Sequence, residues 1–274
     1  IGKYIALAYI ERIADINNFF FIIAYMNQYN YLNIAYCKLL YDQFGLDFYL
    51  YNDNRISIDS KNDFYFQEKG LSCEGIDNSF SNFELLFVCF LIAKEGKEDY
   101  LIPVIFEIND SFEFLILKND VTIPNIAINK VIQIKSDIDS YTDKDISICL
   151  VTEESIGKCF YFYLDSLEFK PYFENEVYIF DNCRKDTYGM KVTYIFEKKN
   201  FLFSYLNEDG NIQIYDLSGG NNKTIIKGCD RPFGYSVIYL SEEEGYLFPS
   251  DICQEKEKYT FEIINLDEEV LSSG

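Results

Sequence analysis

The sequence predicts an all-β fold, a β-propeller built from four-stranded blades, on three observations. A hairpin pattern recurs along the chain, apolar residues alternate with a period of two, and Phe and Tyr number 25 and 24 among 274 residues. A period of two indicates a strand, as in residues 212–214 and 259–263. Phe and Tyr fit the pleated, half-buried surface of a sheet, and 49% hydrophobic residues supply a core that excludes disorder.

The repeated unit is a short apolar strand, a polar turn and a second, aromatic-rich strand. Five such hairpins occupy residues 19–41, 83–108, 146–164, 200–217 and 245–266. Gly96, Gly157 and Gly210 lie where a turn favours a residue that tolerates positive φ. Short apolar stretches before and after most hairpins complete about four strands per unit, which is the size of a propeller blade. We expect five blades, or six if residues 176–196 or residues beyond this sequence supply another.

A β-sandwich and a pair of small barrels are the alternative architectures for this pattern. The propeller is favoured because a sandwich of this length would need about twice the usual number of strands. Residues 4–14 suit a helix by composition, but we expect a terminal strand that helps to close the ring. Five prolines and the absence of a low-complexity tract indicate a single domain over residues 1–274.

The start of the sequence and its apolar runs indicate how the segment relates to a membrane. The sequence begins at Ile1 and contains no signal-peptide pattern, so we expect a segment excised from a longer surface protein. The longest apolar run, residues 85–93, has the length of a core strand and is too short to span a membrane as a helix. We therefore expect no direct membrane insertion of this segment, and any anchor lies outside it.

The net charge of −21 argues against binding to nucleic acid or to an anionic membrane, because such a surface repels phosphates. No run of Lys or Arg reverses the charge locally. The acidity is explained most simply by solubility, and a Ca²⁺ site or a basic partner protein is the alternative.

Several catalytic chemistries are excluded by residues that the sequence lacks. There is no His, which removes Ser-His-Asp and Cys-His catalysis and His-ligated zinc. No close cysteine pair, phosphate-binding loop or dinucleotide-binding motif is present. Carboxylates remain the only candidates, and no spacing pairs Asp145 with Glu107. We therefore predict no catalytic, cofactor-binding or metal-ligating residues, no cofactor, and a protein that is not an enzyme.

Eight cysteines favour disulfides and hence an oxidising, extracellular or cell-surface setting reached by the secretory pathway. Cys149 ends one strand of the third hairpin and Cys159 begins the next, so the two can face each other across the ladder. Buried free thiols are the alternative. Two N-x-[ST] triplets, at Asn109 and Asn222, fall at predicted turns and are candidate glycosylation sites.

The hairpin ISICLVTEESIGKCFYFYL, with a cysteine at each side of a polar turn, resembles the blades of the β-propeller family of the malaria-parasite cysteine-rich protective antigen. The resemblance continues in KNFLFSYLNEDGNIQIYDL and GCDRPFGYSVIYLSEEEGYLF. Related propellers occur in parasite surface proteins of the six-cysteine family. The resemblance implies a non-enzymatic scaffold on invasive Plasmodium stages that bridges other surface proteins or receptors.

The leading functional expectation is thus a secreted or cell-surface adhesion or scaffold propeller that acts in host-cell invasion. Its partner would be a parasite surface protein or a host receptor. The alternative is a carbohydrate-binding or glycoside-hydrolase-like propeller, because some propellers cleave glycosides with paired acids. An intracellular protein-interaction propeller is a third hypothesis, which reduced cysteines would favour.

Overall fold

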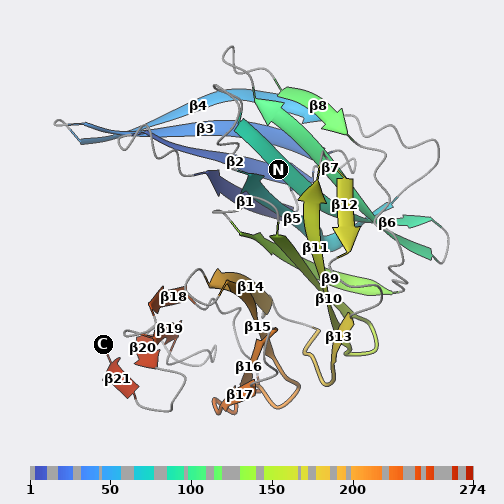
Figure 1. Ribbon diagram of the computed structural model, residues 1–274, viewed down its shortest axis with the longest axis vertical. Helices are drawn as coiled ribbons and strands as arrows, with labels where there is room; N and C mark the ends of the chain where they lie inside the picture. Colours follow the sequence, from blue (N-terminus) through green and yellow to red (C-terminus); the bar gives the residue numbers. More distant parts are fainter. Residues whose placement is uncertain are drawn as a thin grey trace. The chain divides into compact units, whose positions relative to one another are not determined.

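In the computed structural model the regular elements of the described residues are β-strands (Figure 1). The described residues are 4–10, 18–26, 32–42, 45–56, 65–76, 85–95, 98–108, 114–118, 130–139, 145–165, 168–171, 177–185, 190–195, 199–217, 222–230, 238–241, 245–249, 261–264 and 270–273. Within these ranges the regular elements are all strands. The described residues contain no helix that is long and apolar enough to cross a membrane.

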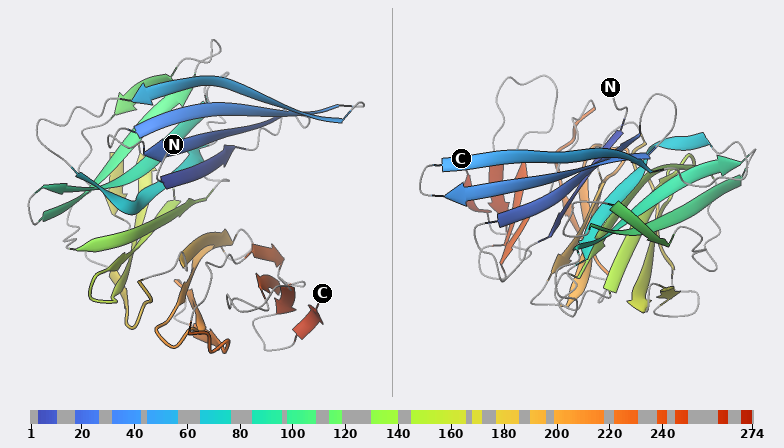
Figure 2. Two further views of the ribbon diagram at one scale, coloured as in Figure 1. Left: turned by 180° about the vertical axis from the view of Figure 1, so that it is seen from behind. Right: turned by 90° about the horizontal axis from the view of Figure 1, so that it is seen from above.

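The first two sheets each consist of four consecutive antiparallel strands. The first contains β1 (Tyr4–Ile10), β2 (Asn18–Met26), β3 (Leu32–Asp42) and β4 (Gly45–Ile56). The second contains β5 (Tyr65–Ile76), β6 (Leu85–Glu95), β7 (Glu98–Ile108) and β8 (Phe114–Lys118). Figure 2 shows the twist of the long strands β2 to β4 from two further sides.

The third sheet has a divided outer strand. It contains β9 (Val131–Ile138), β10 (Asp145–Thr152), β11 (Gly157–Asp165), β12 (Glu168–Pro171) and β13 (Val177–Phe180). Strand β12 pairs with the last four residues of β11, and β13 pairs with its first four. The two short strands therefore share the edge that one strand occupies in the other sheets.

The last two sheets return to the simple four-stranded order. The fourth contains β14 (Met190–Ile195), β15 (Asn200–Leu206), β16 (Ile212–Asp216) and β17 (Asn222–Ile225). The fifth contains β18 (Ile238–Ser241), β19 (Gly245–Pro249), β20 (Phe261–Ile264) and β21 (Val270–Ser273). Four four-stranded sheets and one sheet with a divided outer strand, all antiparallel, confirm the prediction of an all-β fold with the blade repeat of a propeller.

Burial explains why these segments form strands. Every residue of β15 is buried, which is expected of a strand covered on both faces. Along β9 buried and half-buried residues largely alternate, as in a strand with one covered face. The largest fully buried side chains are aromatic or branched aliphatic, so the Phe-rich composition of the chain fills the core.

The chain separates into two compact units. The first contains residues 1–146 and 161–176, and the second contains residues 147–160 and 177–274. In the first unit β1 lies against β5 and β5 against β9, so the first strands of successive sheets are neighbours. In the second unit β14 contacts β18 in the same way. Adjacent first strands are typical of neighbouring propeller blades. The single domain over residues 1–274 stays a prediction.

Residues 4–10 form a strand, as expected, which pairs with β2 as the first strand of its sheet. Two local expectations need correction. The segment 176–196 supplies no sixth blade, because it contributes β13 to the third sheet and β14 to the fourth. Gly210 has the positive φ expected of the turn, 76°, whereas Gly157 already belongs to β11.

Candidate functional site

The predicted cysteine pair lies together in the second unit. Cys149 of β10 and Cys159 of β11 are joined by a disulfide, with a Cα–Cα distance of 4.1 Å. The short Cα distance suits two residues that face each other across an antiparallel ladder. Both side chains are completely buried.

A second disulfide, Cys73–Cys89, joins directly paired residues of β5 and β6, and sequence reasoning did not name it. Cys229 is disulfide-bonded as well. Cys183 is a buried free thiol, and burial raises its pKa to about 12. The disulfides are consistent with an extracellular or secreted protein, because such bonds persist in oxidising compartments.

Of the two predicted glycosylation sites, the structure describes only the backbone of the second. Asn109 lies outside the described residues. Asn222 is the first residue of β17, where a turn was expected. Its backbone is paired with Tyr215 of β16.

A pair of acidic residues closes the turn between β9 and β10 in the first unit. The Asp139 N–H donates to the Asp145 carbonyl oxygen at 2.8 Å, so the two residues flank the turn as partners. Asp139 is only 1% exposed, while Asp145 is half-buried. Sequence reasoning singled out Asp145 but missed Asp139, whose only sequence signal was its position six residues ahead of the first residue of the next strand.

The surroundings of Asp145 alter its protonation. Burial raises the pKa of this carboxyl, and the charge of Asp139 raises it further. The Tyr161 hydroxyl lies 3.4 Å from Asp145 Oδ2, and this hydrogen bond acts in the opposite direction. Glu107, the other carboxylate considered from the sequence, belongs to β7 and pairs with Leu86 and Leu115 in the second sheet.

A second polar group in the first unit joins neighbouring sheets. The Ser136 hydroxyl of β9 donates to Glu74 Oε1 at 2.7 Å, and its backbone N–H donates to Ser72 Oγ at 3.1 Å. Ser72 and Glu74 lie on β5, so these bonds connect the first strands of the second and third sheets. The three polar side chains therefore have a structural role, which is to link these two sheets.

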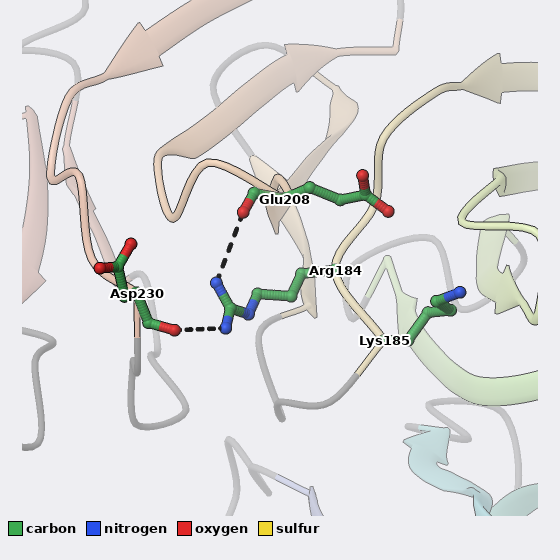
Figure 3. A pocket seen from close by; sticks show the side chains of 4 residues that line it. All are labelled: Arg184, Lys185, Glu208 and Asp230. Carbon is green, nitrogen blue, oxygen red and sulfur yellow. Dashed lines mark hydrogen bonds between the residues drawn. The ribbon is translucent and has the colours of Figure 1, made fainter.

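A cavity of about 420 Å³ opens in the second unit (Figure 3). Its lining residues are Arg184, Lys185, Glu208 and Asp230. The Arg184 guanidinium donates to the carbonyl oxygens of Glu208 and Asp230, at 3.5 and 2.6 Å, and lies between the two residues. The carboxylates of Glu208 and Asp230 point away from each other on opposite sides of Arg184. The two carboxylates therefore do not face each other across this cavity.

Residues around the cavity also hold the tip of the β10–β11 hairpin. The Cys183 N–H donates to the Ser155 carbonyl oxygen at 2.8 Å, and the Ser155 hydroxyl donates to Glu208 Oε1 at 2.7 Å. Lys185 Nζ donates to the Glu153 carbonyl oxygen at 3.0 Å. Most polar groups around the cavity thus have structural partners. Among the described residues, no group of three or more Cys, Asp or Glu side chains has the arrangement of a metal site.

No protein-family model and no curated protein matches the sequence. Solved structures are similar in fold. One belongs to the GH130 family of mannoside phosphorylases, which contains glycoside hydrolases that target β-1,2-mannosidic linkages in Candida mannan. It is 8% identical with a TM-score of 0.41, and 97% of this chain and 85% of that chain are covered.

A second similar structure is the catalytic domain of the GH62 α-L-arabinofuranosidase of Coprinopsis cinerea. It is 11% identical with a TM-score of 0.44, and 100% of this chain and 86% of that chain are covered. At these identities the likeness concerns the fold alone, so any activity has to be argued from the residues of this chain.

These comparisons correct two expectations. The expected non-enzymatic adhesion or scaffold module in host-cell invasion is contradicted by these two matches, one from the GH130 family and one a GH62 α-L-arabinofuranosidase. The expectation that the chain is not an enzyme is contradicted by the same structures. The resemblance to the malaria-parasite propeller family stays a prediction.

Proposed function

We propose that this chain is a carbohydrate-active propeller that hydrolyses a glycosidic bond, with Asp145 as the general acid. The C1–O bond to the leaving sugar breaks as Asp145 protonates the leaving oxygen, a water oxygen forms the new bond to C1, and a proton from that water restores Asp145. The observation that carries the proposal is the raised pKa of the Asp145 carboxyl beside Asp139. A carboxyl that stays protonated at a higher pH can give its proton to the oxygen of a leaving sugar. Two neighbouring carboxyl groups with different environments are a frequent arrangement for this role.

The two acids would have different tasks. Asp139 is almost inaccessible, so it acts on its neighbour through its charge and not by touching substrate. Asp145 is half-buried and keeps a solvent-facing part, which a substrate can approach. Tyr161, hydrogen-bonded to Asp145 Oδ2, fixes the carboxyl orientation and is a positioning residue.

The test is hydrolysis of a panel of aryl glycosides by the full chain and three variants. Asp145→Asn should abolish turnover, since the amide has no acidic proton. Tyr161→Phe should retain turnover but move the basic limb of the pH–rate profile upward, because the hydrogen bond that lowers the pKa of Asp145 is lost. Asp209→Asn, in the exposed β15–β16 turn, is the matched control and should leave turnover unchanged. Equal activity of Asp145→Asn and the unmodified chain would refute the assignment.

We further propose that the protein works outside the cytosol, after passage through the secretory pathway. The support is chemical: Cys73–Cys89, Cys149–Cys159 and the bonded Cys229 need an oxidising compartment to persist. Thiol counting by mass spectrometry on unreduced protein from its natural source tests this. Free thiols at all eight cysteines would overturn it.

A further inference from the structure

Strand β17 is the outer strand of the fourth sheet, whose order is β14-β15-β16-β17. An outer strand offers unpaired N–H and C=O groups to other chains and commonly needs protection against edge-to-edge pairing. Asn222 begins this strand, and residues 222–224 form the sequon Asn-Lys-Thr.

The register places Thr224, the last residue of the sequon, on the exposed face of the strand. Thr224 is paired with Gln213 and is exposed, and its hydroxyl donates to Gln213 Oε1 at 2.8 Å. Ile225, one residue further, is paired with Ile212, and both are buried. The last residue of the sequon therefore lies on the exposed face of β17.

An exposed apolar side chain follows directly after β17. Ile226 is 81% exposed, the most exposed large hydrophobic side chain among the described residues. It lies two residues beyond Thr224 and immediately before Lys227 and Gly228, whose N–H groups are both held by Asn211 Oδ1 at 2.9 Å. The position of Ile226 is thus fixed, and its apolar surface has no cover within the part of the chain that the structure describes.

A half-buried aromatic ring lies opposite the sequon. Tyr215 of β16 is the direct backbone partner of Asn222 in the ladder. The Tyr215 ring packs against Phe180, with a centroid distance of 4.4 Å, and stacks on Tyr205 at 6.2 Å. It is therefore held in place by other rings while part of it remains open to solvent.

We propose that Asn222 carries an N-linked glycan whose first sugar packs on Tyr215 and whose bulk covers Ile226 and the open edge of β17. The transfer uses a lipid-pyrophosphate-linked oligosaccharide as donor. The Asn222 amide nitrogen forms a bond to C1 of the first sugar, the C1–oxygen bond to the lipid pyrophosphate breaks, and the amide nitrogen loses a proton. A bulky, hydrated substituent at an outer strand prevents association through that edge. The inference is independent of the chemistry proposed for Asp145.

Occupancy is tested on the full chain, secreted from a eukaryotic cell that performs N-glycosylation. Peptide mapping after enzymatic deglycosylation should find the Asn-to-Asp conversion at position 222. Asn222→Gln and Thr224→Val should each remove that glycan, while Thr224→Ser should keep it because the hydroxyl is retained. Asn109→Gln is the matched control and should leave the glycan at Asn222 in place. An unmodified 222–224 peptide in the secreted protein would overturn the assignment.

The covering role has its own test. Enzymatic deglycosylation of the folded protein should increase self-association in light scattering, and Ile226→Ser should suppress that increase. In the glycosylated protein, nuclear Overhauser contacts should join the Tyr215 ring to the first sugar, and Tyr215→Ser should abolish them. A deglycosylated protein that stays monomeric at the same concentration would overturn the role of the glycan in covering the edge.

Discussion

Replacing Gly157 by alanine tests how tightly the beginning of β11 packs against the segment that follows β13. A Cβ atom at this position would lie 2.8 Å from the Cys183 sulfur and 3.4 Å from Phe180 Cβ. Cys183 is completely buried, so its sulfur has no solvent to move into. The sulfur or the strand has to shift by about 0.6 Å to reach an ordinary van der Waals distance.

The magnitude follows from two opposing effects. Forcing one methyl group into a packed interior costs about 1–3 kcal/mol. Replacing glycine by alanine also restricts the unfolded chain, which contributes about 0.4–1 kcal/mol of stability. We therefore expect Gly157→Ala to lower the free energy of unfolding by about 1–2 kcal/mol.

A double-mutant cycle with Cys183→Ala identifies the cause. Cys183→Ala removes the sulfur that the new methyl group would meet, so the two changes should be coupled by about 1 kcal/mol. The assay is urea unfolding of the oxidised protein followed by tyrosine fluorescence, which suits a chain with 24 Tyr and no Trp. If Gly157→Ala costs as much with Cys183→Ala as without it, the packing argument is refuted.

Three further predictions follow from the same structure. Gly210→Ala should destabilise the protein by more than about 2 kcal/mol, because φ is 76° and the Cβ would lie 2.1 Å from the Cys229 carbonyl oxygen; chemical unfolding measures this, and a neutral change would contradict it. Replacing both Cys149 and Cys159 by alanine should lower stability by about 3 kcal/mol, since the bond closes a loop with a sequence separation of 10; a melting temperature unchanged by the substitution would argue against it. Asp145→Asn should stabilise the protein at neutral pH, because the pKa of Asp145 is raised in the folded state and its ionisation there is unfavourable. That gain should shrink as the pH falls through the folded pKa and vanish below the ordinary value for aspartate, whereas a constant gain at every pH would exclude ionisation as the cause.

The sequence was sufficient for those parts of the fold that depend on neighbouring residues. The hairpin around Cys149 and Cys159 has a turn of four residues, so the two cysteines face each other whatever surrounds them. The pair Cys73–Cys89 could not be named in this way. It depends on the pairing of β5 with β6 and on a register shift between Phe66 and Leu71.

Other features depended on contacts that a linear pattern does not contain. Strand β5 includes the polar run QEKG and lacks a period of two, so its membership of the second sheet was not recognised. The hydrogen bond from the Asp139 N–H to the Asp145 carbonyl oxygen joins two residues that no sequence pattern pairs. Burial then changes the protonation of Asp145, and burial is a property of the assembled core.

The order of strands in the sheets has a consequence for synthesis of the chain. In four of the five sheets, strands pair in the order in which they are made, so a sheet can form as soon as its fourth strand is available. The disulfides Cys73–Cys89 and Cys149–Cys159 each lie within one sheet and span 16 and 10 residues, so they can form before later sheets exist. Strand β13 is the exception, since it follows β12 in the chain but pairs with the beginning of β11. The third sheet is therefore where folding has to wait for residues that arrive late.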